Sequence, residues 1–328
     1  MPSLTSANPL PQLAGKICLT EGGIETYMQY KKGHEFRHFC LFDLMNRPDA
    51  LADLRTYHEQ LIKVALKHKV GAVLDGVHYR TSRDWGELLG YSKQGLKEVV
   101  IQGIEFYKDL SRQHQTADSP MPVSGVVGPR GDAYKIGRVM SAEEAEDYHS
   151  EQLETMKQAG ADFATALTFN QVDEAIGVVR AARTVGLPAV VSFALGADGK
   201  LKSGVDLSDA IETVDEATGN GPAYFMVNCT HPVDFARAFE TPGSWVERLK
   251  GLRPNASSLA HGVLCQLGRL EEGNPVELGQ QMADMARRFP HINVWGGCCG
   301  TDAVHVDEIA KAVLRVRTPI QPELAATG

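Results

Sequence analysis

Short runs of β-branched and apolar residues alternate with longer amphipathic stretches along the whole chain of 328 residues. No Ser/Gly-rich linker or break in composition divides this pattern, which is typical of one domain built on a parallel sheet. The apolar runs predict eight strands, at residues 16–21, 72–79, 122–127, 162–169, 189–195, 224–229, 257–264 and 292–296.

The amphipathic stretches predict helices near residues 49–69, 93–114, 142–159, 171–185, 207–218, 233–250, 275–289 and 303–316. Ser141, with Glu144 three residues later, forms a capping box that marks the start of one of them. Eight strand-then-helix units predict an α/β fold, a single (β/α)8 TIM barrel over residues 16–318. A doubly wound open sheet is the alternative, but no G-x-G-x-x-G motif follows the first strand. Residues 1–15 are expected to form a flexible N-terminal arm, and residues 319–328 a C-terminal tail.

Chemistry in a TIM barrel is found where strands end and the following loops begin. The residues predicted at these positions are 21–23, 75–80, 128–131, 168–170, 192–199, 228–230, 261–265 and 296–301. The first connection, residues 22–48, is long and rich in Tyr, His and Phe, so we expect it to form a lid or a wall of the substrate pocket.

The composition and charge of the chain disfavour some classes of binding partner. The net charge of −8 and the absence of a basic run disfavour nucleic acid, and no apolar stretch approaches the length of a membrane span. The first residues lack the charged and apolar regions of a secretion signal, so a cytoplasmic location is expected. The sequence leaves open whether the protein is a monomer or a small homo-oligomer.

Six cysteines are too few for a disulfide scaffold, and two of them, Cys298 and Cys299, are adjacent. Cys229 ends the predicted sixth strand and the pair follows the eighth, so all three fall on the same rim of the barrel. Three thiolates leave a tetrahedral Zn²⁺ with one open position, as in a catalytic zinc site, and a substrate thiol on that position would lose its proton. We expect the remaining cysteines to be small core residues; these are Cys18, Cys40 and Cys265.

Several motifs resemble those of the homocysteine S-methyltransferase family, which includes betaine–homocysteine and S-methylmethionine–homocysteine methyltransferases. They are GGCCGT at 296–301 with His305, VNC at 227–229, EGGIET at 21–26, and the stretches 47–73, 141–163 and 191–204. This resemblance covers nearly the whole chain. It implies a TIM barrel, one Zn²⁺ bound by Cys229, Cys298 and Cys299, and a homocysteine bound through its sulfur.

The same resemblance implies that Glu21 and the backbone around Gly22 and Gly23 hold the amino acid end of the substrate. Two motifs depart from the family pattern: residues 77–80 read VHYR where NTYQ is usual, and Leu167-Thr168 replaces an ET pair. Asp75, His78 and Arg80 are therefore candidates for rebuilding the pocket. The further substrate-contact candidates are Tyr79, Thr168 and Asn228.

These observations predict an S-methyltransferase that transfers a methyl group from a sulfonium or quaternary ammonium donor to a zinc-bound thiol, with homocysteine giving methionine as the leading case. A cationic donor favours an aromatic wall, for which the candidates are Tyr27, Tyr30, Phe36, Phe39 and Tyr79. Three alternatives remain: a different thiol acceptor, a zinc-dependent hydrolase, and a redox-sensing zinc protein.

Overall fold

The computed structural model describes residues 10–317 except 135, 136, 138 and 260. Within these residues nine parallel strands form one sheet in the order β2-β1-β9-β8-β7-β6-β5-β4-β3. Strands β2 and β3 are two halves of one strand, because only Val73 lies between them and its N–H donates to Leu19 at 2.7 Å. The first half pairs with β1 and the second with β4, so the sheet closes into the predicted (β/α)8 barrel.

The strands are short, and those in the middle of the chain are buried on both faces, as expected when helices cover a parallel sheet. Their bounds are β1 Cys18–Leu19, β2 Gly71–Ala72, β3 Leu74–Asp75, β4 Val123–Val127, β5 Phe163–Phe169, β6 Ala189–Phe193, β7 Tyr224–Asn228, β8 Leu249–Arg253 and β9 Val294–Trp295.

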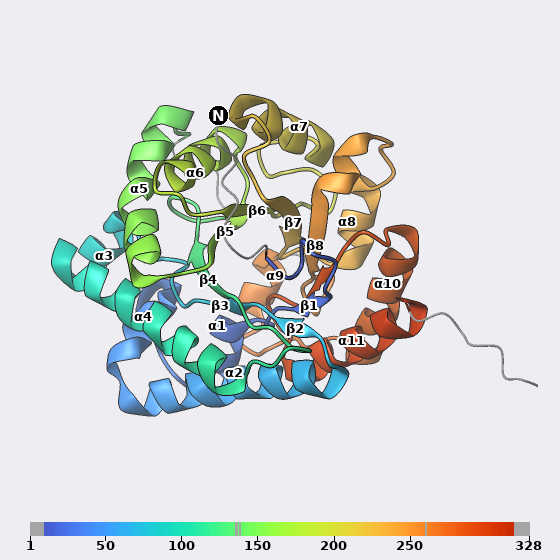
Figure 1. Cartoon of the computed structure of the whole chain (residues 1–328), viewed down its shortest axis with the longest axis horizontal. Coiled ribbons are helices and arrows are strands. Elements are labelled where there is room, and N and C mark those ends of the chain that lie inside the picture. Colours follow the sequence, from blue (N-terminus) through green and yellow to red (C-terminus); the bar gives the residue numbers. More distant parts are fainter. Residues whose placement is uncertain (1–9, 135–136, 138, 260, 318–328) are drawn as a thin grey trace, which may run out of the picture.

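Long amphipathic helices surround the barrel (Figure 1). The helices are α1 Ile24–Thr26, α2 Pro48–His68, α3 Arg83–Leu89, α4 Lys93–His114, α5 Ala142–Ala159, α6 Val172–Thr184, α7 Leu207–Thr218, α8 Pro232–Ala238, α9 His261–Gln266, α10 Pro275–Arg288 and α11 Ala303–Arg317. The capping box of α5 is present: Ser141 Oγ accepts from the Glu144 N–H, and the Ser141 N–H donates to Glu144 Oε2, both at 3.2 Å.

The predicted strand at 257–264 is wrong, and the predicted helix at 233–250 begins where expected but is much too long. Helix α8 ends at Ala238, a 3₁₀ turn covers Ser244–Arg248, and the seventh barrel strand is β8. Residues 257–259 lie instead in a loop, and residues 261–264 lie at the start of α9. The error arose because β8 carries Lys250 and Arg253, whose charges resemble the polar face of a helix rather than a buried strand.

The buried hydrophobic residues that the structure describes form three clusters, of which the smallest holds Met140, Ala145 and Tyr148. The largest one lies between strands and helices, and the second one includes Phe163, Val190 and Met226, whose neighbours are strand residues, so it fills the barrel interior. Residues 10–15, which the sequence places in the flexible arm, form a turn against the barrel. There Gln12 is fully buried and donates to Tyr224 Oη at 3.0 Å. Residues 1–9 and the predicted tail lie outside the described residues.

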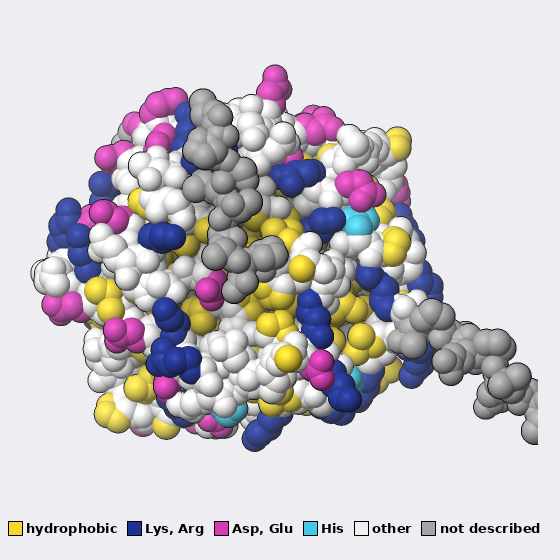
Figure 2. All heavy atoms as spheres, in the orientation of Figure 1, with side chains coloured by type: hydrophobic (Ala, Val, Ile, Leu, Met, Phe, Trp, Pro, Cys, Tyr) yellow, Lys and Arg dark blue, Asp and Glu magenta, His cyan; other side chains and the backbone are white. Residues whose placement is uncertain are grey.

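Acidic and basic side chains are interspersed around the perimeter of the face seen in Figure 2, while hydrophobic side chains gather nearer its centre. Of the helices that the structure describes, none combines the length and the apolar character needed to cross a membrane.

Candidate metal and substrate site

Three thiols meet at the carboxyl ends of the strands. Cys229 directly follows β7, and Cys298 and Cys299 follow β9, 69 and 70 residues later in the chain. The Sγ atom of Cys229 lies 2.7 Å from that of Cys298 and 3.7 Å from that of Cys299, and all three sulfurs lie within 4.8 Å of one another. The structure thus brings together the three cysteines singled out in the sequence.

Backbone contacts between neighbouring loops hold the thiols in place. The N–H of Cys229 donates to Arg253 O at 3.2 Å, and the N–H of Cys298 donates to Pro254 O at 2.8 Å. Gly300 adopts φ +82°, a conformation that residues with a Cβ rarely adopt. A Cβ on Gly23 would lie 2.6 Å from Cys298 O, so the first loop approaches the cysteine loop as closely as glycine permits.

The protonation of the three thiols is unequal. Hydrogen bonds from Cys229 and Cys299, aided by the charge of Arg253, hold the pKa of Cys298 well below its usual range. The pKa values of Cys229 and Cys299 are raised, chiefly because they donate to neighbouring sulfur. Cys298 therefore has the lowest pKa of the three thiols.

The thiols fit a zinc ion chemically and in their spacing. Two sulfurs bound to one tetrahedral Zn²⁺ at about 2.3 Å are separated by about 3.8 Å. The Cys229–Cys299 pair already has this separation at 3.7 Å, and the Cys229–Cys298 pair would have to open by about 1 Å from 2.7 Å to admit the ion.

A buried ionic network lies next to the cluster, and its central residue was not among those predicted from the sequence. Arg253, at the end of β8, is 2% exposed. Its Nη2 donates to Glu21 Oε1 at 2.9 Å, its Nη1 to Asp75 Oδ2 at 2.5 Å, and its Nε to Gly297 O at 3.3 Å. Burial, reinforced by the charge of Asp75, raises the pKa of Glu21 to about 8.

Asn228, the last residue of β7, connects three strands beneath the thiols. Its Oδ1 accepts from the Thr168 N–H at 2.9 Å and from Ser192 Oγ at 2.6 Å, and its Nδ2 donates to Thr168 Oγ1 at 2.8 Å. Nδ2 also lies 3.8 Å from Cys298 Sγ. These bonds hold Thr168 at φ +65°, an uncommon conformation for a residue other than glycine.

A cavity of about 350 Å³ opens over the thiols. Its lining comes from the long first connection and from loops after several strands. The lining residues are Glu25, Thr26, Gln29, Tyr30, Phe39, Tyr79, Arg80, Asp132, Tyr134, Leu167, Thr168, Cys229, Ser257, Leu264, Arg269, Leu270, Glu271, Cys298, Cys299 and Gly300. The first connection therefore does supply a wall, through α1 and the residues that follow it.

The residues predicted to contact the substrate match the residues that line the cavity only in part. Of the predicted substrate contacts, Tyr79 and Thr168 line the cavity, and Arg80 joins them. Of the predicted aromatic wall, Tyr30, Phe39 and Tyr79 line it.

The other residues predicted to contact substrate are not part of the cavity lining and instead hold the loops of the site in place. Glu21 and Asp75 bind Arg253, Gly22 and Gly23 pack against the loop 298–301, and Asn228 is fully buried. A role of these residues toward substrate stays a prediction.

His78 lies away from the cavity. Its ring packs against Gly103 of α4, and its Nε2 lies 3.2 Å from Val100 O. Burial lowers the pKa of His78 to about 4, so the ring is neutral and structural in this setting. The predicted contact residues at 261–265 include His261 and Cys265, whose side chains lie outside the described part of the molecule.

Glu25 is the cavity residue of most chemical interest that the sequence did not single out. It is partly buried on α1, and burial, with a contribution from the charge of Cys298, raises its pKa to about 7. In the sequence, Glu25 is marked only by its position two residues after the glycines of EGGIET. A solvated glutamate at the end of a helix would have the same position.

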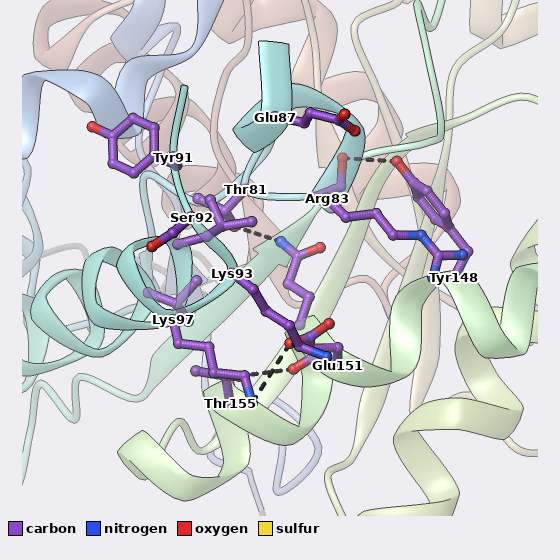
Figure 3. Close-up of a pocket in the computed structure, with 14 residues that line it drawn as sticks. Thr81, Arg83, Glu87, Tyr91, Ser92, Lys93, Lys97, Tyr148, Glu151 and Thr155 are labelled. Carbon is purple, nitrogen blue, oxygen red and sulfur yellow. Dashed lines mark hydrogen bonds and ion pairs between the residues drawn. The ribbon is translucent and has the colours of Figure 1, made fainter. Parts of the chain in front are cut away.

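A second cavity, of about 380 Å³, lies on the outside of the barrel between α3, α4 and α5. Several of its polar side chains pair with one another. Figure 3 shows Lys93 and Lys97 reaching toward Glu151, and Tyr148 Oη donates to Ser82 Oγ at 2.8 Å. This cavity lacks cysteine among its lining residues, so the thiol-bearing cavity is the candidate site.

The fold and the site define a (β/α)8-barrel protein with a thiol-rich pocket at the carboxyl ends of its strands. A model of the homocysteine S-methyltransferase family matches residues 18–313, and the chain belongs to that family, a class of methyltransferase enzymes. The predicted resemblance is confirmed.

Similar proteins include betaine–homocysteine S-methyltransferase 1 of Rattus norvegicus, which is 25% identical over 220 residues, 60% of this chain and 53% of the relative. The match thus spans about half the length of this relative. Two solved structures of the homocysteine methyltransferase MmuM from Escherichia coli share the fold at 18% identity and a TM-score of 0.72. The oxidised form covers 95% of this chain and 100% of its own, and the metallated form covers 93% and 99%.

Proposed function

We propose that this protein is a zinc-dependent S-methyltransferase whose acceptor is a small thiol, with homocysteine as the leading acceptor and methionine as its product. The observation that supports this most directly is the convergence of three sulfurs, within 4.8 Å of one another, on the floor of a cavity large enough for a small substrate. Membership of the homocysteine S-methyltransferase family supports the same reaction.

Cys229, Cys298 and Cys299 would hold the metal. When bound, Zn²⁺ would supply Lewis acidity that keeps the acceptor sulfur deprotonated at neutral pH. Asn228 and the loop contacts of Cys298 fix the directions of the thiols, so these residues would determine where the acceptor sulfur is placed.

Methyl transfer requires the acceptor sulfur, the methyl carbon and the leaving atom to lie in line. A new C–S bond forms on the acceptor, the bond from the methyl carbon to the cationic sulfur or nitrogen of the donor breaks, and its electron pair stays on the leaving atom, which departs neutral. The cavity walls would provide this alignment. Tyr30, Phe39 and Tyr79 give the cavity aromatic surface that suits a sulfonium or quaternary ammonium group.

The thiols must stay reduced to bind metal, so the proposal places the protein in a reducing compartment such as the cytoplasm.

The test is a methyl-transfer assay with homocysteine and a panel of sulfonium and quaternary ammonium donors, with and without a zinc chelator. Methionine that forms with at least one donor and disappears on chelation supports the proposal. Methyl transfer that survives complete removal of the metal would contradict zinc dependence, and transfer only to other thiols would change the acceptor.

A further inference from the structure

Helix α1 is fastened to the cysteine loop on both sides of Glu25. Before it, the N–H of Gly23 donates to Thr301 O at 2.9 Å, and a Cβ on Gly23 would lie 2.6 Å from Cys298 O. After it, Thr26 Oγ1 accepts from the Gly300 N–H at 3.2 Å. Glu25 therefore has a fixed place beside the thiols and not on a loosely attached loop.

Glu25 differs from the other charged residues of the cavity in its partners. Arg269 and Glu271 pair with each other at 3.0 Å, Arg80 donates to His38 O and stacks on Trp85, and Asp132 has an interaction of its own. Among the described side chains none forms an ion pair with the Glu25 carboxylate. It lines the cavity, and the charges of Arg253 and Arg80 act on it without a direct ion pair.

The surroundings of Glu25 favour a cationic ligand. Tyr79 and Leu167 also line the cavity, and the lining residues near the end of β5, Leu167 and Thr168, carry no carboxylate. A carboxylate that is partly removed from water and lacks an ion-pair partner among the described side chains is less stable than one in water, and an ammonium group that enters the cavity would relieve this by a charge-assisted hydrogen bond.

We propose that Glu25 binds the ammonium group of an amino-acid thiol whose sulfur lies on the cysteine cluster, and thereby selects amino-acid thiols over other thiols. The short links from Gly23 and Thr26 to residues 298–301 favour the acceptor over the methyl donor as its ligand, because they keep the carboxylate close to the place of the acceptor sulfur. This inference rests on the proposed function, which places the acceptor sulfur on the cysteine cluster.

The experiment compares zinc-loaded wild type with Glu25→Gln, Glu25→Asp and the control Glu35→Gln, whose carboxylate is exposed in the same connection and outside the cavity lining. Zinc per chain is measured in each variant. Calorimetric titration then gives the Kd of L-homocysteine and of 4-mercaptobutanoate, which is homocysteine without its amino group.

Glu25→Gln is expected to weaken homocysteine binding about tenfold or more and 4-mercaptobutanoate binding less than about twofold, at unchanged zinc content. Glu25→Asp should give an intermediate loss, and Glu35→Gln none. An equal effect of Glu25→Gln on both thiols, no effect on either, or no homocysteine binding by the wild type would overturn the proposal. So would an effect confined to the KM of the donor.

The two proposals fail separately in this design. If homocysteine binds with the expected dependence on Glu25 but no donor yields methionine, the proposed function fails and the assignment of Glu25 holds. If methionine forms equally well in the Glu25→Gln variant, the assignment fails and the function holds.

Discussion

Arg253 and Glu21 form a salt bridge with an Nη2–Oε1 distance of 2.9 Å, and both side chains are almost completely buried, at 2% and 5% exposed. The same guanidinium binds Asp75, so one cation faces two carboxylates. Glu21 Oε2 and Asp75 Oδ1 have no hydrogen-bond partner among the residues that the structure describes. The network joins β1, β3 and β8 across the barrel, next to the loop that carries Cys298.

Replacing Arg253 by Met should destabilise the protein strongly, because two buried carboxylates would lose their counter-charge. We expect a loss of about 3–5 kcal/mol in the free energy of unfolding, measured by urea denaturation. The triple variant with Glu21→Gln and Asp75→Asn added should recover much of this loss, since no buried charge then remains. A loss below about 1 kcal/mol in Arg253→Met would show that the network contributes little.

The Cys298→Ala variant should contain less than the wild-type amount of zinc and lose turnover, because two thiols remain of the three that lie within 4.8 Å. Elemental analysis of the purified protein measures the metal directly. The matched control is Cys18→Ala: this thiol is fully buried in the barrel interior, so its loss should lower stability without changing zinc content. Full zinc and full rate in Cys298→Ala would rule out the proposed ligand set.

The sequence predicted the architecture well where local signals and burial agree. Helices α4, α5 and α7 have the predicted bounds, and α4 and α5 begin at Ser92 and Ser141, whose side chains cap them. The three cysteines could be found because their type and their place after strands are visible in the sequence.

The sequence failed where a tertiary contact overrides the local pattern. Arg253 makes β8 look polar, and it is buried only because Glu21 and Asp75, 232 and 178 residues away, provide its counter-charge. Glu25 was missed for a related reason: its exposure depends on how Gly23 and Thr26 attach α1 to the cysteine loop. His78 was expected near substrate, yet the absence of a side chain at Gly103 leaves room for its ring against α4.

Asn228→Ala should destabilise the carboxyl ends of the central strands. The substitution leaves the buried Thr168 N–H and Ser192 hydroxyl without their acceptor and releases Thr168 from its positive φ. A loss of about 1–3 kcal/mol is expected from urea denaturation. The control Ser192→Ala removes one donor and leaves Asn228 bonded to Thr168, so it should cost less. Equal losses in the two variants would contradict the central role of Asn228.

The stability of the protein should fall on acidification because His58 is buried and neither of its ring nitrogens has a hydrogen-bond partner in the described part of the chain. Its ring lies edge-on to Tyr57 and Tyr107, with centroids 5.3 and 4.7 Å away. This burial lowers the pKa of His58 from 6.5 to about 3. Between these values the unfolded chain binds a proton that the folded chain does not, so the contribution of neutral His58 to stability is full only well above its unfolded pKa of 6.5 and is lost as the pH falls toward 3.

At pH 5 this single group should account for about 2 kcal/mol of lost stability relative to neutral pH. His58→Phe keeps an aromatic ring between the two tyrosines and removes the titration, so its free energy of unfolding should depend less steeply on pH in the acid range. Part of the dependence should remain, because the pKa of His78 is also lowered by burial, to about 4.

Urea denaturation of both proteins from pH 8 to pH 4.5 measures the two curves. They should run parallel above about pH 7.5, where His58 is neutral in both states, and diverge below it. Curves that stay parallel down to pH 4.5 would mean that a proton reaches His58 in the folded protein without cost.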